Sequence, residues 1–64
     1  MADKISLCAA RKNRKLTQGE VAKVLGVTEK TISSWETGKT FPNGAQFLIL
    51  CNLYGRSADG ISLP

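Results

Sequence analysis

Polar side chains that form hydrogen bonds are concentrated in one short stretch of this sequence, residues 28–37, which reads TEKTISSWET. If the stretch is a helix, Ile32, Trp35 and Glu36 share one face, because positions three and four apart lie together. The side chains that point away from this face are all polar: Lys30, Ser33, Ser34 and Thr37. Ammonium and hydroxyl groups form hydrogen bonds with the base edges and phosphates of nucleic acids. The chemistry that this stretch offers is therefore recognition of a polar groove.

Other chemistry has little support in the sequence. There is no histidine, and the two cysteines, Cys8 and Cys51, form no CxxC motif, so neither a zinc site nor a disulfide framework is expected. The sequence also lacks paired carboxylates near a nucleophile and a glycine-rich phosphate-binding loop. We therefore expect no enzymatic activity, no metal, no cofactor and no small-molecule ligand.

Two short helices joined by a tight turn are predicted to position the polar stretch. Thr17 and Glu20 have the spacing of a capping box, so a helix should begin at Thr17. Its apolar face is formed by Val21, Ala22 and Leu25. Gly26 is expected to end this helix in a left-handed conformation, Thr28 to cap the next helix, and Gly38 to end it. Such a turn sets the second helix across the first and leaves its polar face free to enter a groove, for which DNA is the obvious candidate.

Two further helices are predicted on either side of this pair. Residues 3–14 are expected to form a first helix that is capped by Asp3. Its inner stripe combines Ile5 or Leu7 with Ala10, Arg11 and Arg14. Residues 44–54 are expected to form a fourth helix that is capped by Asn43 and ends at Gly55. The inner face of the fourth helix holds Phe47, Leu50, Cys51 and Tyr54.

The length and composition limit the chain to one domain. With 64 residues, 42% of them apolar, we predict a single all-α domain over residues 1–64, a compact bundle of four to five short helices. Nine Lys and Arg against five Asp and Glu give a net charge of +4, which favours a polyanionic partner without identifying it. The basic run at residues 11–15 suits either a solvated helix end or phosphate contact. Neither a signal peptide nor a membrane-spanning stretch of about 18 apolar residues is evident, so we expect a cytoplasmic protein.

A family pattern runs through almost the whole chain. It consists of LTQ at 16–18, EVA at 20–22, LGVT at 25–28, TIS at 31–33, and WE at 35–36 with Gly38, Lys39 and Pro42. Arg11 before this stretch and residues 50, 54, 55 and 57 after it fit the same pattern. The pattern resembles the Cro/repressor class of helix-turn-helix proteins, the XRE family. The resemblance implies a lambda repressor-like DNA-binding domain with its helix-turn-helix at residues 17–37.

The resemblance also implies roles for individual residues. The side chains that it places at DNA bases or phosphates are Gln18, Thr28, Glu29, Lys30, Ser33, Ser34, Thr37 and Lys39. It further implies a structural ion pair between Arg11 and Glu36. Within the DNA-contacting set, Lys30 suits guanine O6 and N7, and the threonine methyl groups suit thymine methyl groups. Glu29 either accepts a hydrogen bond from cytosine N4 or only stabilises the start of its helix.

The chain departs from the family pattern at several positions. Lys15 stands where relatives often have glycine, so the first turn is expected to be strained or differently shaped. Gly19 costs its helix about 1 kcal/mol against alanine, and it either allows close approach to phosphates or is simply tolerated. Arg56 and Gly60 are also atypical, which predicts that a last turn from Ser57 to Ile61 is short or frayed.

The fourth helix carries more apolar residues than one small core needs. Leu48, Ile49 and Leu53 widen its stripe, and exposed apolar surface of this kind often marks an interface. We therefore predict a homodimer, at least on DNA, that reads two half-sites about 34 Å apart. The predicted function is sequence-specific binding of double-stranded DNA by a phage-type Cro or repressor that acts by occupying an operator. The alternatives are an antitoxin-type regulator that also binds a protein toxin, and a protein-interaction adaptor on the same fold.

Overall fold

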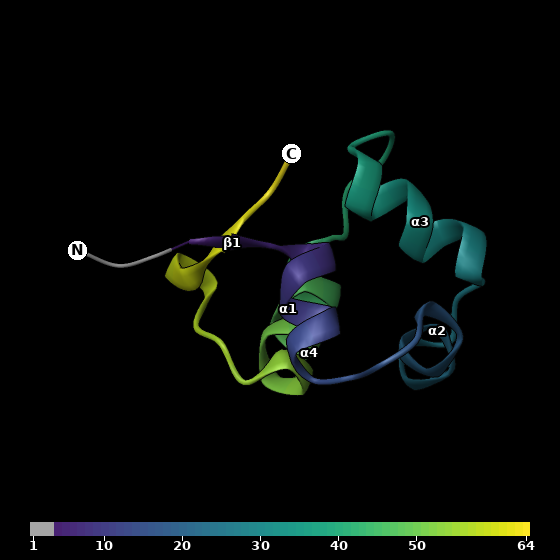
Figure 1. Ribbon diagram of the computed structural model, residues 1–64. Coiled ribbons are helices and arrows are strands. Elements are labelled where there is room, and N and C mark those ends of the chain that lie inside the picture. Colours follow the sequence, from purple (N-terminus) through teal and green to yellow (C-terminus); the bar gives the residue numbers. More distant parts are fainter. Residues whose placement is uncertain (1–3) are drawn as a thin grey trace.

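The computed structural model describes residues 4–64, and this part of the chain forms four α-helices (Figure 1). In chain order, the elements are β1 (Ile5–Ser6), α1 (Leu7–Asn13), α2 (Gln18–Leu25), α3 (Glu29–Thr37), α4 (Gly44–Tyr54), the 3₁₀ turn η1 (Ala58–Gly60) and β2 (Ile61–Ser62). The predicted all-α bundle is confirmed. The strands are an unpredicted addition: β1 and β2 pair in parallel, with Ile5 opposite Ile61.

Helices α2, α3 and α4 begin and end where the sequence predicts, because each has its own local caps. The Thr17 side chain accepts a hydrogen bond from the Glu20 backbone N–H at 3.1 Å, and the Glu20 carboxylate accepts one from the Thr17 N–H at 2.9 Å. Asn43 and Gln46 form the same reciprocal cap on α4, whereas on α3 the Thr28 hydroxyl accepts a hydrogen bond from the Thr31 backbone N–H. The residues that end the three helices are glycines with a positive φ: Gly26, Gly38 and Gly55.

The prediction of the first helix was wrong about the residue at which the helix begins. Helix α1 begins at Leu7, and its cap is Ser6, whose hydroxyl accepts a hydrogen bond from the Ala9 N–H at 3.1 Å. Residues 5 and 6 are extended because they pair with β2, and Asp3 lies outside the described residues. Arg14, which was predicted for the inner stripe, is instead an exposed residue just after the last turn of α1.

The last turn is short, as predicted, but it ends at Gly60 instead of Ile61. Element η1 spans three residues, and Ser57 precedes it without a side-chain capping bond. Ile61 belongs to β2 and is buried. The pairing with β1 therefore takes over the end of the predicted turn.

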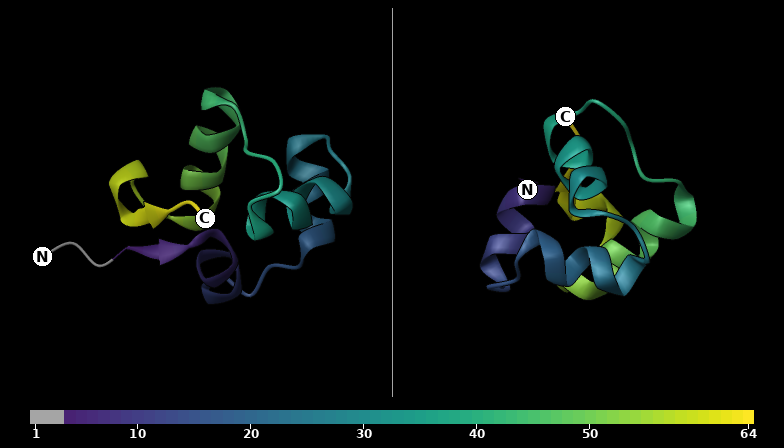
Figure 2. Two further views of the ribbon diagram at one scale, coloured as in Figure 1. Left: turned by 90° about the horizontal axis from the view of Figure 1, so that it is seen from above. Right: turned by 90° about the vertical axis from the view of Figure 1, so that its right-hand side faces the viewer.

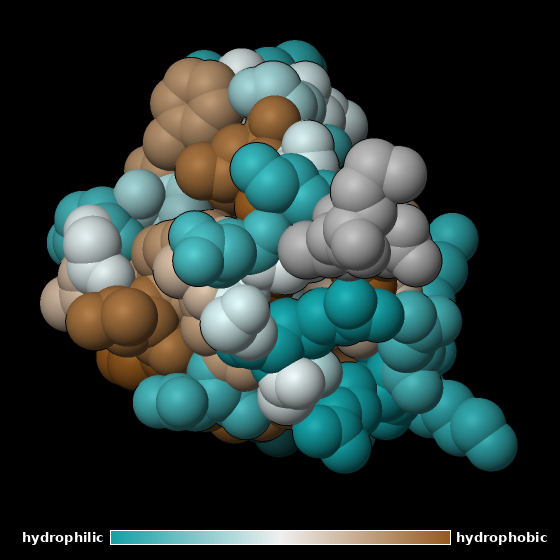
Figure 3. Space-filling model, turned by 90° about the vertical axis from the view of Figure 1, so that its left-hand side faces the viewer, coloured by the Kyte–Doolittle hydropathy of each residue, from teal (hydrophilic) through white to brown (hydrophobic). Residues whose placement is uncertain are grey.

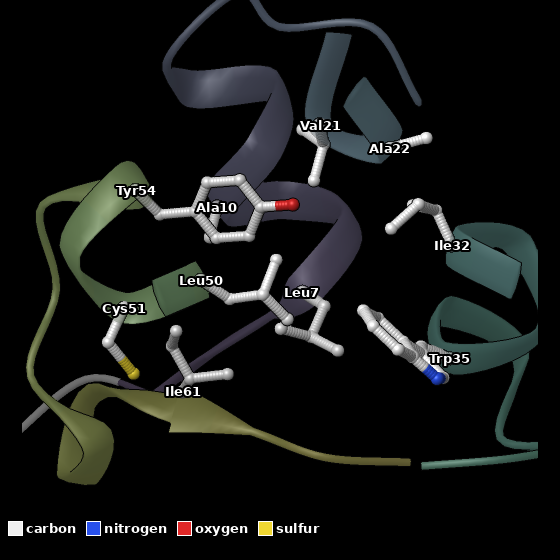
Figure 4. Packing of buried hydrophobic residues seen from close by; sticks show 10 residues of the cluster. All are labelled: Leu7, Ala10, Val21, Ala22, Ile32, Trp35, Leu50, Cys51, Tyr54 and Ile61. Atoms are coloured by element: carbon white, nitrogen blue, oxygen red, sulfur yellow. The ribbon is translucent and has the colours of Figure 1, made fainter. Parts of the chain in front are cut away.

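One core joins the helices. Its buried residues are Leu7, Ala10, Val21, Ala22, Ile32, Trp35, Leu50, Cys51, Tyr54 and Ile61. Figure 4 shows Ile32 and Trp35 pointing from α3 toward Leu7 at the centre of this cluster. Every α-helix contributes at least two of these residues, so none of the four can be removed without exposing part of the core.

The elements follow one another along the length of the molecule. Helices α2 and α3 occupy one end, the strand pair occupies the other, and α1 and α4 lie between them (Figures 1 and 2). The chain end returns toward α3, since a methyl group at Gly38 would lie 3.1 Å from Cβ of Pro64. Among residues 4–64, no helix combines the length and apolar character needed to cross a membrane.

Candidate nucleic-acid interface

Helix α3 separates its apolar and polar residues onto opposite faces. Ile32 and Trp35 are 1% and 3% exposed and belong to the core. The side chains of the predicted contact set on this helix and its cap are exposed or half-buried: Thr28, Glu29, Lys30, Ser33, Ser34 and Thr37. The core thus fixes the roll of α3 about its axis, and the same roll turns these polar groups outward.

The outward hydroxyl and ammonium groups differ in how free they are. The Thr28 hydroxyl accepts the Thr31 backbone N–H at 3.2 Å as the helix cap. The Thr37 hydroxyl donates back to the Ser33 carbonyl at 3.0 Å. Within residues 4–64, the side chains of Lys30, Ser33 and Ser34 have no hydrogen-bond partner in the protein. Their donors are available to an external partner.

An ion pair holds α3 against α1. Arg11 Nε donates to Glu36 Oε2 at 2.8 Å and Nη2 to Oε1 at 3.3 Å, while the two side chains are 11% and 7% exposed. Arg11 Nη1 also donates to the Leu16 carbonyl at 2.9 Å. Burial of the Glu36 carboxyl would raise its pKa, but the hydrogen bonds from Arg11 and Gln18 outweigh this effect and lower the pKa overall. The paired groups therefore remain charged, and they connect α1, the turn before α2, and α3.

Gln18 joins this cluster from the first position of α2. Its Nε2 donates to Glu36 Oε1 at 3.0 Å. A glutamine amide carries two N–H donors, so one remains after this bond. The side chain that was predicted to meet a phosphate is thereby held in a fixed orientation at the start of α2.

Lys39 follows the end of α3 and is exposed. Its backbone N–H donates to the Ser34 carbonyl at 2.9 Å, so the turn after Gly38 is tied to the last turn of the helix. The Lys39 ammonium group extends from a fixed backbone at the opposite end of α3 from Glu29.

Comparison with known proteins agrees with this geometry. Residues 9–61 match the family model HTH_3, described as helix-turn-helix. The chain belongs to this helix-turn-helix family. Repressor protein C2 of Salmonella phage P22 is 39% identical over 51 residues, which are 80% of this chain and 24% of the repressor. The chain thus spans less than a third of the length of this relative. No solved structure matches the chain. The resemblance to Cro/repressor DNA-binding proteins is confirmed.

The basic run of this helix-turn-helix protein is partly used inside the fold. Arg11 forms the ion pair, and Arg14 Nε donates to the Tyr54 carbonyl at 3.1 Å in the last turn of α4. Lys12 and Lys15 are exposed. Two of the four cations at positions 11, 12, 14 and 15 therefore stabilise the domain. The resemblance implied this role for Arg11, whereas the bond from Arg14 to α4 was not expected.

Lys15 adopts the left-handed conformation, with φ at 57°, and is the one such non-glycine among residues 4–64. A residue with a Cβ is strained there by about 1–2 kcal/mol. The turn before α2 has kept the backbone that suits glycine. The sequence predicted that this turn is either strained or differently shaped, and the structure shows a strained turn.

The predicted interface residues of α4 in this helix-turn-helix domain are not equivalent. Leu48 and Ile49 are 61% and 42% exposed, whereas Leu53 is half-buried and packs against the core. Figure 3 shows groups of apolar side chains on one face of the molecule, separated by hydrophilic ones. Three other apolar residues are exposed that the sequence pattern did not indicate: Val24, Phe41 and Leu63. Hydrophobic periodicity gave no signal for the last two, because they lie outside the helices.

Proposed function

We propose that the chain binds double-stranded DNA with sequence preference and represses transcription by occupying an operator. The observation that carries this proposal is the outward polar face of α3, which Arg11, Glu36 and Gln18 hold in place. The match to the phage P22 repressor supports the regulatory role. This role requires no catalytic residue and places the protein in the cytoplasm with its DNA.

The proposed mode of binding puts α3 in the major groove. Lys30 donates to guanine O6 and N7, and Ser33 and Ser34 add hydrogen bonds to neighbouring bases or phosphates. Gln18 and Lys39 hold the phosphate backbone. The net charge of +4 adds attraction that does not depend on sequence.

We further propose that two copies bind one operator. Leu48 and Ile49 form an exposed apolar pair on α4, and burial against a second copy would remove this surface from water. A two-fold dimer would present two α3 helices to half-sites about 34 Å apart on one face of the duplex.

The direct test is selection of bound duplexes from a random pool, followed by affinity measurements with two lysine variants. Lys30→Ala should weaken binding to the selected duplex about tenfold and relax the base preference at one position. Lys23→Ala removes the same charge from an exposed position in the last turn of α2 and should leave the preference unchanged. Lack of any enriched sequence, or equal effects of the two variants, would contradict base reading by α3 and favour a protein-interaction adaptor.

A further inference from the structure

The carboxylate of Glu29, at the start of α3, lies over the first turn of α2. A methyl group at Gly19 would be 3.2 Å from Glu29 Oε1, 3.4 Å from its Cδ and 3.8 Å from its Cγ. The first of these distances is shorter than an ordinary van der Waals contact. The missing side chain at position 19 therefore makes the space in which the Glu29 side chain rests.

The other glycine in a first helical turn lacks this feature. Gly44 is also a first-turn helical glycine, but a methyl group there would meet nothing within 4 Å. Neither glycine has a positive φ, so the backbone requires glycine at neither position. Glycine is a weaker helix former than alanine, so each position carries a cost in helix stability. At position 19 this cost coincides with a contact to a predicted DNA-reading residue, whereas at position 44 it does not.

The acceptor capacity of Glu29 is unused by the protein. Its side chain is exposed and, within residues 4–64, makes no hydrogen bond or salt bridge. A carboxylate can only accept hydrogen bonds, and in the major groove the available donors are exocyclic amino groups such as cytosine N4. Next to the phosphates it is repelled, so it favours sites that supply such a donor and disfavours sites that do not.

We propose that Gly19 is a specificity-determining residue: it lets the Glu29 carboxylate lie against α2, where Glu29 accepts a hydrogen bond from a cytosine amino group in the operator. A methyl group at position 19 would push the carboxylate away from this position by a few tenths of an ångström. Gly19 acts through Glu29 and is a positioning residue. The inference rests on the proposed DNA-binding function and adds one base preference to it.

The test is a double-mutant cycle on base preference at each position of the selected duplex. The wild type should prefer a cytosine at one position about tenfold over the other bases, and Glu29→Ala should abolish that preference. Gly19→Ala should reduce it at least about threefold, because the added methyl group displaces the carboxylate. In the Glu29→Ala background, Gly19→Ala should have no further effect on preference. Gly44→Ala is the matched control and should keep the wild-type preference.

The failure of this inference can be distinguished from failure of the proposed function. Gly19→Ala should remain folded, because alanine favours helix, and circular dichroism checks this. A wild-type preference that responds to Lys30→Ala but not to Glu29→Ala or Gly19→Ala would overturn this inference alone. An equal effect of Gly19→Ala with and without Glu29 would also overturn it, since the effect would not pass through the carboxylate. A wild type with no base preference at any position would overturn the proposed function and this inference together.

Discussion

Helices α3 and α4 have the same local design but opposite outer surfaces. Each is capped by a polar side chain, from Thr28 or Asn43, and each ends at a left-handed glycine. The outer face of α3 carries ammonium, carboxylate and hydroxyl groups, whereas that of α4 carries Leu48 and Ile49 at 61% and 42% exposure. The residues that cap and end a helix are thus separate from those that set the chemistry of its outer surface. One surface suits the edges of bases, and the other suits a second apolar surface.

Arg11→Ala is expected to have the largest effect, because it removes the link that holds α3 in position. Removing Arg11 from this partly buried ion pair leaves the Glu36 charge without its cationic partner, and we expect the free energy of unfolding to fall by about 2–3 kcal/mol. Urea denaturation at neutral pH measures this loss. Lys12→Ala, on the same helix but exposed, should change stability by less than about 0.5 kcal/mol. Equal effects of the two substitutions would show that the ion pair does not anchor α3.

Ile49→Asp tests the outer surface of α4. A carboxylate in the proposed dimer interface should weaken self-association by about 2 kcal/mol, or roughly thirtyfold. Sedimentation equilibrium, with and without the selected duplex, measures this change. Val24→Asp places the same charge on an equally apolar exposed site of α2 and should leave self-association unchanged. A wild type that is monomeric at high concentration, both free and on DNA, would remove the dimer from the account.

Lys15→Gly should stabilise the turn between α1 and α2. Glycine relieves the strain at φ 57° but loses more backbone entropy on folding, so we expect a net gain of about 0.5–1 kcal/mol. Thermal unfolding should show a higher melting temperature than for the wild type. Lys15→Ala removes the same charge and keeps the Cβ, so a similar rise for alanine would assign the gain to charge and not to strain.

The pH dependence of stability should show the smallest effect, because burial of Glu36 partly offsets the hydrogen bonds that stabilise its charge. The folded-state pKa of Glu36 lies below the ordinary value of 4.5. Its stabilising contribution is therefore complete above about pH 5 and is lost as the pH falls through the lowered value. Glu36→Gln should flatten the acid limb of a plot of unfolding free energy against pH. Because the pKa of Glu20 is also lowered, by its hydrogen bonds to Thr17, Glu20→Gln should also flatten the acid limb. An unchanged acid limb in Glu36→Gln would contradict the charged pair.

The parts of the fold that the sequence predicted are those with local causes. Helices α2 and α4 begin at side-chain caps whose two members are three residues apart, Thr17 with Glu20 and Asn43 with Gln46. Each of these helices ends at a left-handed glycine. The start of α1 has a distant cause, because the pairing of Ile5 with Ile61 holds the chain extended up to the Ser6 cap. No local sequence pattern at residues 3–6 indicates the pairing with residues 61 and 62.

The candidate site also combines features with local causes and features that depend on distant packing. The polar face of α3 was predictable, because Ile32 and Trp35 at helical spacing determine which side is buried. The bond from Gln18 to Glu36 and the contact of Glu29 with Gly19 depend on how α2 and α3 pack, which residue spacing does not specify. From the sequence, Gly19 either allows close approach to phosphates or is simply tolerated. The Glu29 carboxylate beside it is seen only in the packed structure.

The proposed mode of binding requires that the outer face of α3, and not that of α4, meets the DNA. An NMR titration of the ¹⁵N-labelled protein with its selected duplex tests this most directly, because every backbone amide reports on its own surroundings. The account predicts the largest shift changes from Thr28 to Thr37 and at Gln18 and Lys39, with smaller changes at Leu48 and Ile49. The largest changes on α4 or on the strand pair, with α3 unaffected, would contradict it.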